Sequence, residues 1–201
     1  MDPVTVIFIG RSGSGKGTQA KLLMEELARK DASRDIFYLE TGAKFREFFD
    51  ATDVEHAYSR RRAKAISDAG GLQPEFITVW LWSDVLLNHM HGGEHLVFDG
   101  TPRKLHEAQV LHSAIGFYER TLPSVIFLNT KEGAAVDRLV ARGRYDDQPE
   151  AIKRRMEWFD SDVMPIVDYY RENPTYRVFD IDGSKPVSEV QEEIRRAVFS
   201  Q

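Results

Sequence analysis

The chain has 201 residues, of which 42% are hydrophobic and 29% are charged, and its formal net charge is −5. These values predict one globular domain with room for a small inserted lobe. The absence of cysteine excludes disulfides, cysteine-ligated zinc, iron–sulfur clusters and a thiol nucleophile. Apolar runs are far shorter than the ~20 residues of a membrane span, and the acidic balance argues against a general nucleic-acid binder. We therefore expect a cytoplasmic enzyme or binding module with no membrane or nucleic-acid partner.

Short apolar runs alternate with amphipathic segments along the chain. The runs predicted as strands are Val4–Ile9, Ile36–Leu39, Leu96–Phe98, Val125–Leu128 and Tyr176–Ile181. Predicted helices include Thr18–Lys30, a long helix over Ile152–Tyr170, and a last helix with apolar positions at Val187, Val190, Ile194 and Ala197. This alternation predicts a parallel sheet with helices on both faces, whose ligands lie at the carboxyl ends of the strands.

A glycine-rich loop, Gly10–Thr18, joins the first predicted strand to the first predicted helix. Its glycines let backbone N–H groups curl around an anion, and the helix N-terminus adds partial positive charge. Lys16 can reach the β- and γ-phosphates of a nucleotide, and the region of Thr18 can help to order Mg²⁺. Gly17 follows the lysine, which departs from the common GK[ST] ending.

Further motifs follow in a fixed order. They are Thr41-Gly42 with Arg46, Gly71-Leu72-Gln73-Pro74, Asp99-Gly100-Thr101-Pro102-Arg103, Arg138-Leu-Val-Ala-Arg142-Gly143, Arg144-Tyr-Asp146-Asp147, Arg155 and Gly183. With the opening GxxGSGKGTQ segment, they resemble the motifs of the adenylate kinases and close nucleoside monophosphate kinases, in the short-lid form. The resemblance runs from Gly10 to Gly183, most of the chain.

The resemblance implies an α/β fold of the P-loop type: three layers, a five-stranded parallel sheet, and one kinase domain over 1–201. It also implies a helical lobe at 40–70 that binds the nucleoside monophosphate, and a very short lid at 142–147. The implied reaction is transfer of the ATP γ-phosphoryl group to AMP, with Mg²⁺ accompanying ATP, in a monomer. Two alternatives stay open: a kinase for GMP, CMP or UMP, and a catalytically impaired nucleotide sensor.

The resemblance also assigns residues to the two nucleotides. The ATP side comprises Gly13, Ser14, Gly15, Lys16, Gly17, Thr18, Arg138, Arg142 and Gly183. The AMP side comprises Thr41, Gly42, Arg46, Gly71, Leu72, Gln73, Gly100, Arg103, Glu107, Arg144 and Arg155. Within these sets, the catalytic residues are Lys16, Arg103, Arg142, Arg144 and Arg155. Guanidinium groups suit this reaction because they bind phosphate oxygens bidentately and stay charged.

Carboxylates of the motifs have separate expected roles. Asp99 ends an apolar strand and can hold Mg²⁺ through waters, or it can simply cap the turn that follows. Asp146 and Asp147 are expected to pair with the lid arginines or to cap the next helix. None is needed as a general base, because the acceptor is an anionic phosphate oxygen.

Two positions depart from the family pattern. The lid is very short, since Arg144 follows Arg142-Gly143 directly, and a short lid excludes water less well. Glu107 stands where adenylate kinases place a glutamine that contacts adenine. An ionised carboxylate can accept a hydrogen bond from adenine N6 but cannot donate to N1. The base of the acceptor therefore stays open at this point, with AMP favoured.

The remaining sequence features are expected to be structural, and the motifs of another class of nucleotide-binding protein are missing. A GTP-driven switch is excluded because GKGT, DGTP and NTKE replace the motifs it needs. The cluster of His89, His91 and His95 is expected to be a surface turn. Arg60-Arg61-Arg62 is expected to be a solvated helix face, and Trp80 and Trp82 are expected to pack in the core.

Overall fold

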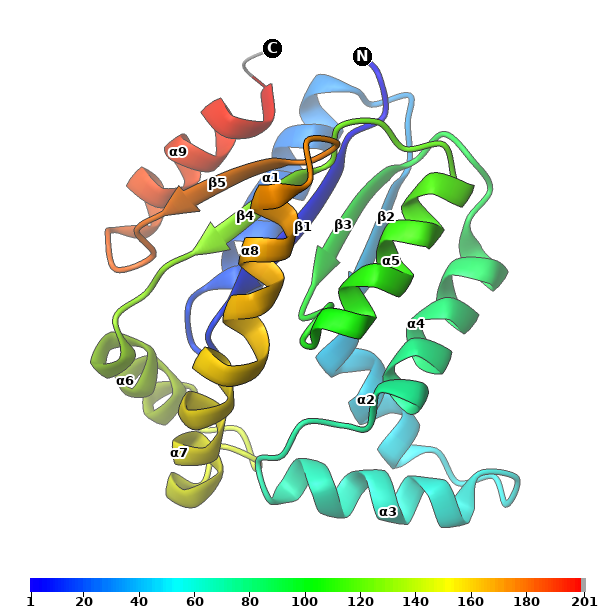
Figure 1. The fold of residues 1–201 in the computed structure, drawn as a ribbon, viewed down its shortest axis with the longest axis vertical. Helices are drawn as coiled ribbons and strands as arrows, with labels where there is room; N and C mark the ends of the chain where they lie inside the picture. The colour runs from blue at the N-terminus through cyan, green and yellow to red at the C-terminus, as the bar shows by residue number, and fades with distance from the viewer. Residues whose placement is uncertain (200–201) are drawn as a thin grey trace.

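The computed structural model describes residues 1–199 and contains a five-stranded sheet in the order β2-β3-β1-β4-β5 (Figure 1). Each neighbouring pair in this order is parallel. The strands are β1 (Thr5–Gly10), β2 (Ile36–Glu40), β3 (His95–Asp99), β4 (Ser124–Leu128) and β5 (Arg177–Ile181). The predicted parallel α/β fold is confirmed, and the predicted strand positions are correct to within one or two residues.

Helices cover both faces of the sheet and make the other two layers. Alternate residues of β1 divide between the faces: Ile7 and Ile9 join one core cluster, while Val6 and Phe8 join the other. The helices of the first cluster are α4 (Glu75–His89), α5 (Leu105–Phe117) and α8 (Met164–Glu172). Those of the second cluster are α1 (Lys16–Lys30) and α9 (Val187–Phe199). Burial of β1 on both faces explains its uninterrupted apolar sequence.

The remaining helices lie beyond the carboxyl ends of the strands, at the bottom of Figure 1. Helices α2 (Thr41–Asp50) and α3 (Ala57–Asp68) share a small core of Phe45, Phe49 and Ala63 with the start of α4. On the other side, α6 (Glu132–Arg142) and α7 (Pro149–Trp158) pack through a second small cluster. These two groups of helices flank the end of the sheet where ligands of parallel α/β folds bind.

The predicted helix over Ile152–Tyr170 is interrupted, which corrects the sequence interpretation. A five-residue π-helix, η1 (Phe159–Val163), separates α7 from α8. Pro165 lies in the first turn of α8, where it has no N–H to donate and its ring crowds the carbonyl of Ser161. The wider π turn relieves this crowding. The apolar face of the predicted helix continues into α8, while the backbone hydrogen bonds change from the α-helical to the π-helical pattern.

Three further expectations are wrong or only partly right. His95 is not in a surface turn, because it is fully buried in β3, where its Nδ1 accepts a hydrogen bond from the backbone N–H of Val4. Arg60 is buried, and it donates to the Phe48 carbonyl oxygen at 2.7 Å. Trp82 is in the core, but Trp80 is 42% exposed.

Within residues 1–199, no cluster of three or more histidine or acidic side chains is arranged to hold a metal ion. In the same part of the chain, no helix combines the length and the apolar character required to cross a membrane.

Candidate active site

The glycine-rich loop curls between the end of β1 and the start of α1. Gly13 and Gly15 adopt positive φ angles of 82° and 98°, a conformation that glycine reaches without strain. A side chain at Gly13 would also collide with the carbonyl of Ala135. The loop therefore requires glycine here both for its backbone angle and for its contact with α6.

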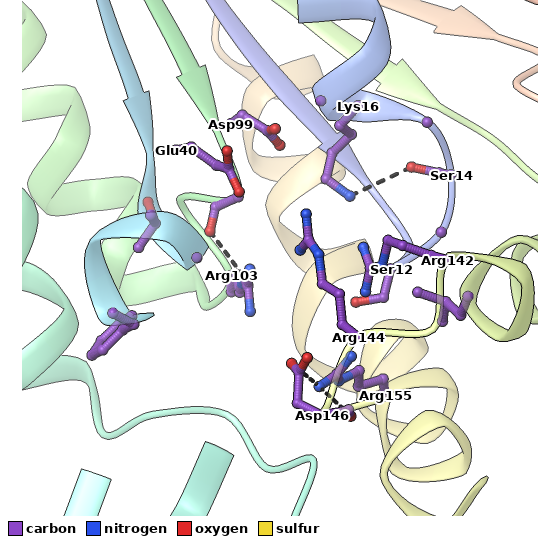
Figure 2. Close-up of a pocket in the computed structure, with 18 of the residues that line it drawn as sticks. Ser12, Ser14, Lys16, Glu40, Asp99, Arg103, Arg142, Arg144, Asp146 and Arg155 are labelled. Carbon is purple, nitrogen blue, oxygen red and sulfur yellow. Dashed lines mark hydrogen bonds and ion pairs between the residues drawn. The ribbon is translucent and has the colours of Figure 1, made fainter. Parts of the chain in front are cut away.

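Lys16, the first residue of α1, turns its side chain back over the loop (Figure 2). Its Nζ donates hydrogen bonds to the carbonyl oxygens of Gly10 and Arg11, each at 2.8 Å. Burial lowers the pKa of Lys16 to about 8, although the charge of Asp99 opposes this shift. The loop thus holds a desolvated cation whose charged form an anion would stabilise.

Asp99 lies at the end of β3, beside the start of α1. Its Oδ2 accepts a hydrogen bond from the Tyr38 hydroxyl at 3.2 Å, and a Cβ placed on Gly17 would lie 3.3 Å from the same oxygen. Burial raises the pKa of Asp99, while Lys16 lowers it. A side chain at position 17 would therefore press on this carboxylate and require it to shift by a few tenths of an ångström.

Two further arginines follow the ends of β2 and β3. Arg103 donates from Nε to the carbonyl of Gly100 at 2.8 Å, and Arg46 donates from Nη2 to Oε1 of Glu40 at 2.8 Å. Burial lowers the pKa of Arg103, with Glu107 opposing the shift. Both guanidinium groups line the same cavity.

Glu107 occupies the first turn of α5 and is 2% exposed. Its Oε2 accepts a hydrogen bond from the backbone N–H of Arg103 at 2.9 Å, so one carboxylate oxygen ties the turn after β3 to the start of the helix. Burial raises the pKa of Glu107. The side chain also lines the cavity, which leaves its other oxygen as the group that can face a ligand.

The segment between α6 and α7 is a compact network of ion pairs. Asp147 accepts from Nε and Nη2 of Arg142 at 2.9 and 2.8 Å, and from Nη1 of Arg155 at 2.9 Å. Asp146 accepts from Nη2 of Arg155 at 2.6 Å. Burial alone would raise the pKa of Asp147, but the hydrogen bonds and charge of Arg142 lower it overall. The expected pairing with a lid arginine is therefore present for Asp147, whereas Asp146 pairs with Arg155 of α7.

Arg144 differs from its neighbours because its guanidinium points into the cavity. Figure 2 shows it projecting from the loop toward Lys16. Among residues 1–199, its side chain has no ion pair within 4.0 Å, although its backbone N–H donates to Asp147 at 3.2 Å. The aspartates of this loop thus pair with Arg142 and Arg155, while Arg144 extends into the cavity.

On the far side of the phosphate loop, Arg138 donates from Nη1 to the carbonyls of Gly183 and Ser14 at 2.9 and 3.3 Å. Gly183 lies close to both Thr130 and the phosphate loop, because an added Cβ would clash with the Thr130 hydroxyl and lie 3.2 Å from the carbonyl oxygen of Ser14. This close passage positions the backbone of Gly183 at the edge of the cavity.

One cavity of about 530 Å³ lies among these groups. It is lined by every residue that the sequence analysis assigned to ATP, AMP or the metal, which are Gly13, Ser14, Gly15, Lys16, Gly17, Thr18, Thr41, Gly42, Arg46, Gly71, Leu72, Gln73, Asp99, Gly100, Arg103, Glu107, Arg138, Arg142, Arg144, Arg155 and Gly183. In a chain of net charge −5, this cavity gathers six arginines and three lysines.

Sequence reasoning missed several residues that also line the cavity, among them Glu40 and Trp158. Trp158 donates from its indole N–H to the carbonyl of Gly70 at 3.0 Å, and its ring centroid lies 6.0 Å from the Arg103 guanidinium carbon. The only sequence signal for Glu40 was its place at the end of a strand, directly before Thr41-Gly42.

Comparison with known proteins matches residues 8–175 to the adenylate kinase family model. The chain belongs to the adenylate kinase family. It is 29% identical over 194 residues to the adenylate kinase of Oenococcus oeni, covering 96% of both chains. It is 32% identical over 193 residues to that of Nocardia farcinica, covering 96% of this chain and 98% of the relative. Adenylate kinase 1 of a Nostoc species is 30% identical over 195 residues, covering 97% and 98%.

Membership of the adenylate kinase family confirms the resemblance drawn from the sequence and makes the chain a nucleoside monophosphate kinase. The cavity is consistent with that chemistry. Phosphoryl transfer between two nucleotides brings many negative charges together, and the protein contributes chiefly position and opposite charge.

Proposed function

We propose that this chain transfers the γ-phosphoryl group of ATP to AMP and forms two molecules of ADP. The observation that carries the proposal is the cavity itself. One end offers a phosphate loop with Lys16, the other offers Arg46 and Arg103, and Arg144 projects between them. Such an arrangement suits two phosphorylated ligands that meet head to head.

The residues would act by binding and by charge neutralisation. Backbone N–H groups of the loop and the α1 N-terminus would bind the ATP phosphates, and Lys16 would follow the transferring group. Arg46 and Arg103 would hold the AMP phosphate, while Arg142, Arg144 and Arg155 would stabilise the charge of the transition state. No general base is required, since the attacking phosphate oxygen is already ionised.

Mg²⁺ is the cofactor we propose with ATP, and Asp99 is the residue that would hold it through waters. The donor set fits, because Mg²⁺ commonly takes one or two carboxylates and completes its shell with water and substrate phosphates. The carboxylate of Asp99 lies beside Gly17 at the phosphate loop, where such a shell would touch the nucleotide. When bound, the ion supplies positive charge to the phosphate oxygens.

We further propose that 40–70 and 142–147 close over the two nucleotides as the acceptor lobe and the lid. Support comes from their positions at opposite sides of the cavity and from the small separate core of α2 and α3. Closure would exclude water before transfer. We propose that the protein acts as a monomer, because one chain supplies both sides of the cavity. We place it in the cytoplasm, where ATP and AMP are available.

The test is to incubate the purified protein with Mg²⁺, ATP and each of AMP, GMP, CMP and UMP, and to separate the products by chromatography. The proposal predicts ADP formation with AMP well above the other acceptors. A Lys16→Met variant is the matched control and should form none. Rapid turnover of GMP, CMP or UMP but not AMP would reassign the acceptor, and ATP binding without any diphosphate product would indicate a nucleotide sensor.

A further inference from the structure

Glu40 is a carboxylate inside an anion-binding cavity. It ends β2 and immediately precedes α2, and its side chain is 28% exposed at the cavity wall. As the residue before the helix it could cap α2, but it makes no side-chain cap hydrogen bond. Instead its Oε1 accepts from Nη2 of Arg46 at 2.8 Å.

The backbone leaves space for this ion pair. A Cβ placed on Gly42 would lie 3.3 Å from Nη1 of Arg46 and 4.0 Å from Oε1 of Glu40. Arg46 comes from the second turn of the same helix, so the two side chains meet over the α2 N-terminus, where anions are favoured. Glu40 therefore lies where an incoming phosphate would bind, and it is paired with the arginine that the phosphate would bind.

Glu40 also adds negative charge next to Asp99. The two residues are register partners on β2 and β3, and Figure 2 shows them together opposite Lys16. After burial and Lys16, the charge of Glu40 is the next influence on Asp99, and it raises the pKa of that carboxyl. The charge of Glu40 also acts on Arg144. It opposes the lowering of the Arg144 pKa that burial causes.

We propose that Glu40 is a specificity-determining residue that binds Arg46 in place of the acceptor phosphate, and that the phosphate of the nucleoside monophosphate must displace it. This inference rests on the proposed function of the site. Its consequence is that Glu40 weakens binding of the phosphate group and not of the nucleoside. Two anions that share one guanidinium repel each other, and at separations of a few ångströms that repulsion exceeds thermal energy.

The experiment measures binding of AMP and of adenosine by calorimetry, without ATP, to the wild type and to Glu40→Gln. We expect Glu40→Gln to bind AMP about fivefold to tenfold more tightly while its affinity for adenosine changes less than twofold. In steady-state assays the same variant should show a lower KM for AMP with kcat within about twofold of the wild type. Glu47→Gln is the matched control, because Glu47 also pairs with a cation on α2, Lys44, but is 63% exposed and outside the cavity, so its constants should not change.

A Glu40→Ser variant, which removes both charge and length, should reproduce the selective gain and guards against a folding defect in the first variant. Unchanged or weaker AMP binding in both folded variants would overturn the proposal and make Glu40 a residue that orients Arg46. Equal tightening of AMP and adenosine would also overturn it. Failure of the wild type to turn over any monophosphate would instead refute the proposed function, so the two failures are distinguishable.

Discussion

Lys16 is a buried lysine in the site, and its protonation state depends on what is bound there. Burial lowers its pKa to about 8, so above that pH the empty protein holds it largely as a neutral amine. Bound phosphates favour the charged form and return the pKa toward 10 or above. Nucleotide binding must therefore be linked to proton uptake in the range between the two values.

We predict that the number of protons taken up on ATP binding is clearly larger at pH 8.5, where Lys16 of the empty protein is largely neutral, than at pH 7, where it is mostly protonated. Calorimetric titrations in two buffers with different ionisation enthalpies measure this number directly. Identical heats in both buffers at pH 8.5 would contradict the lowered pKa, and the pH 7 titration is the internal control.

Glu107 lines the cavity, and we propose that it contacts the base of the acceptor nucleotide. One of its oxygens binds the Arg103 backbone N–H, so only the other can meet the base, and as a carboxylate it cannot donate. We predict that Glu107→Gln lowers KM for AMP severalfold, because the amide can both accept from the Arg103 N–H and donate to adenine. Steady-state kinetics with AMP provide the measurement.

The control for this change is Glu75→Gln, which removes a carboxylate that pairs with His106 on the same helix as Glu107 but lies outside the cavity. It should leave KM unchanged. A rise in KM for AMP in Glu107→Gln, with improved use of another monophosphate, would show that Glu107 selects a different base.

The chemistry of single residues was largely predictable because it resides in local motifs. Phosphate binding is indicated by the type and spacing of the glycines, Lys16 and the arginines. Glu40 could not be found in this way, because its role depends on the register of β2 against β3 and on the direction that Arg46 takes from α2. Those are properties of the folded chain.

At the scale of elements, the loop between α6 and α7 is held by Asp147, whose side chain is 1% exposed. It pairs with Arg142 and Arg155 at once. Removing a buried charge from such a network leaves its partners uncompensated, which is costly. The loop is thereby fixed in a form that directs Arg144 inward.

We predict that Asp147→Asn lowers the free energy of unfolding by about 3 kcal/mol and lowers kcat at least tenfold, because both guanidinium groups lose their shared partner. Urea unfolding and steady-state assays check the two effects. Asp168→Asn, which breaks an exposed pair with Arg171, should cost less than about 0.5 kcal/mol. Full activity in Asp147→Asn would refute the positioning role.

Periodicity predicted the helices well where they follow simple amphipathic patterns and failed where a local constraint intervened. Apolar residues recur regularly across Ile152–Tyr170, yet Pro165 forces the π-helix at Phe159–Val163. Arg60 lies in a run of three arginines that predicted a solvated face, but contacts with Phe48 and Asp53 bury it. Neither contact is visible in the spacing of the sequence.

At the scale of the whole molecule, the parallel sheet gathers segments that are distant in sequence. The loop after β1 and the ends of β2 and β3 bring Lys16, Glu40 and Asp99 to one edge, and the helices and loops beyond that edge supply the arginines. The sequence predicted this convergence because ligands of parallel α/β sheets lie at the carboxyl ends of the strands. It could not predict the volume of the cavity or which arginines would already be paired.

The segment 142–147 that we propose as a lid is short, so the fate of the γ-phosphoryl group is the decisive question, since water competes with AMP when exclusion is incomplete. The most direct measurement follows the label from [γ-³²P]ATP in the presence of Mg²⁺ and AMP. We predict that the label appears in ADP at a rate far above its appearance in inorganic phosphate. Label that accumulates in inorganic phosphate, or that remains in ATP, would contradict phosphoryl transfer as the function of this cavity.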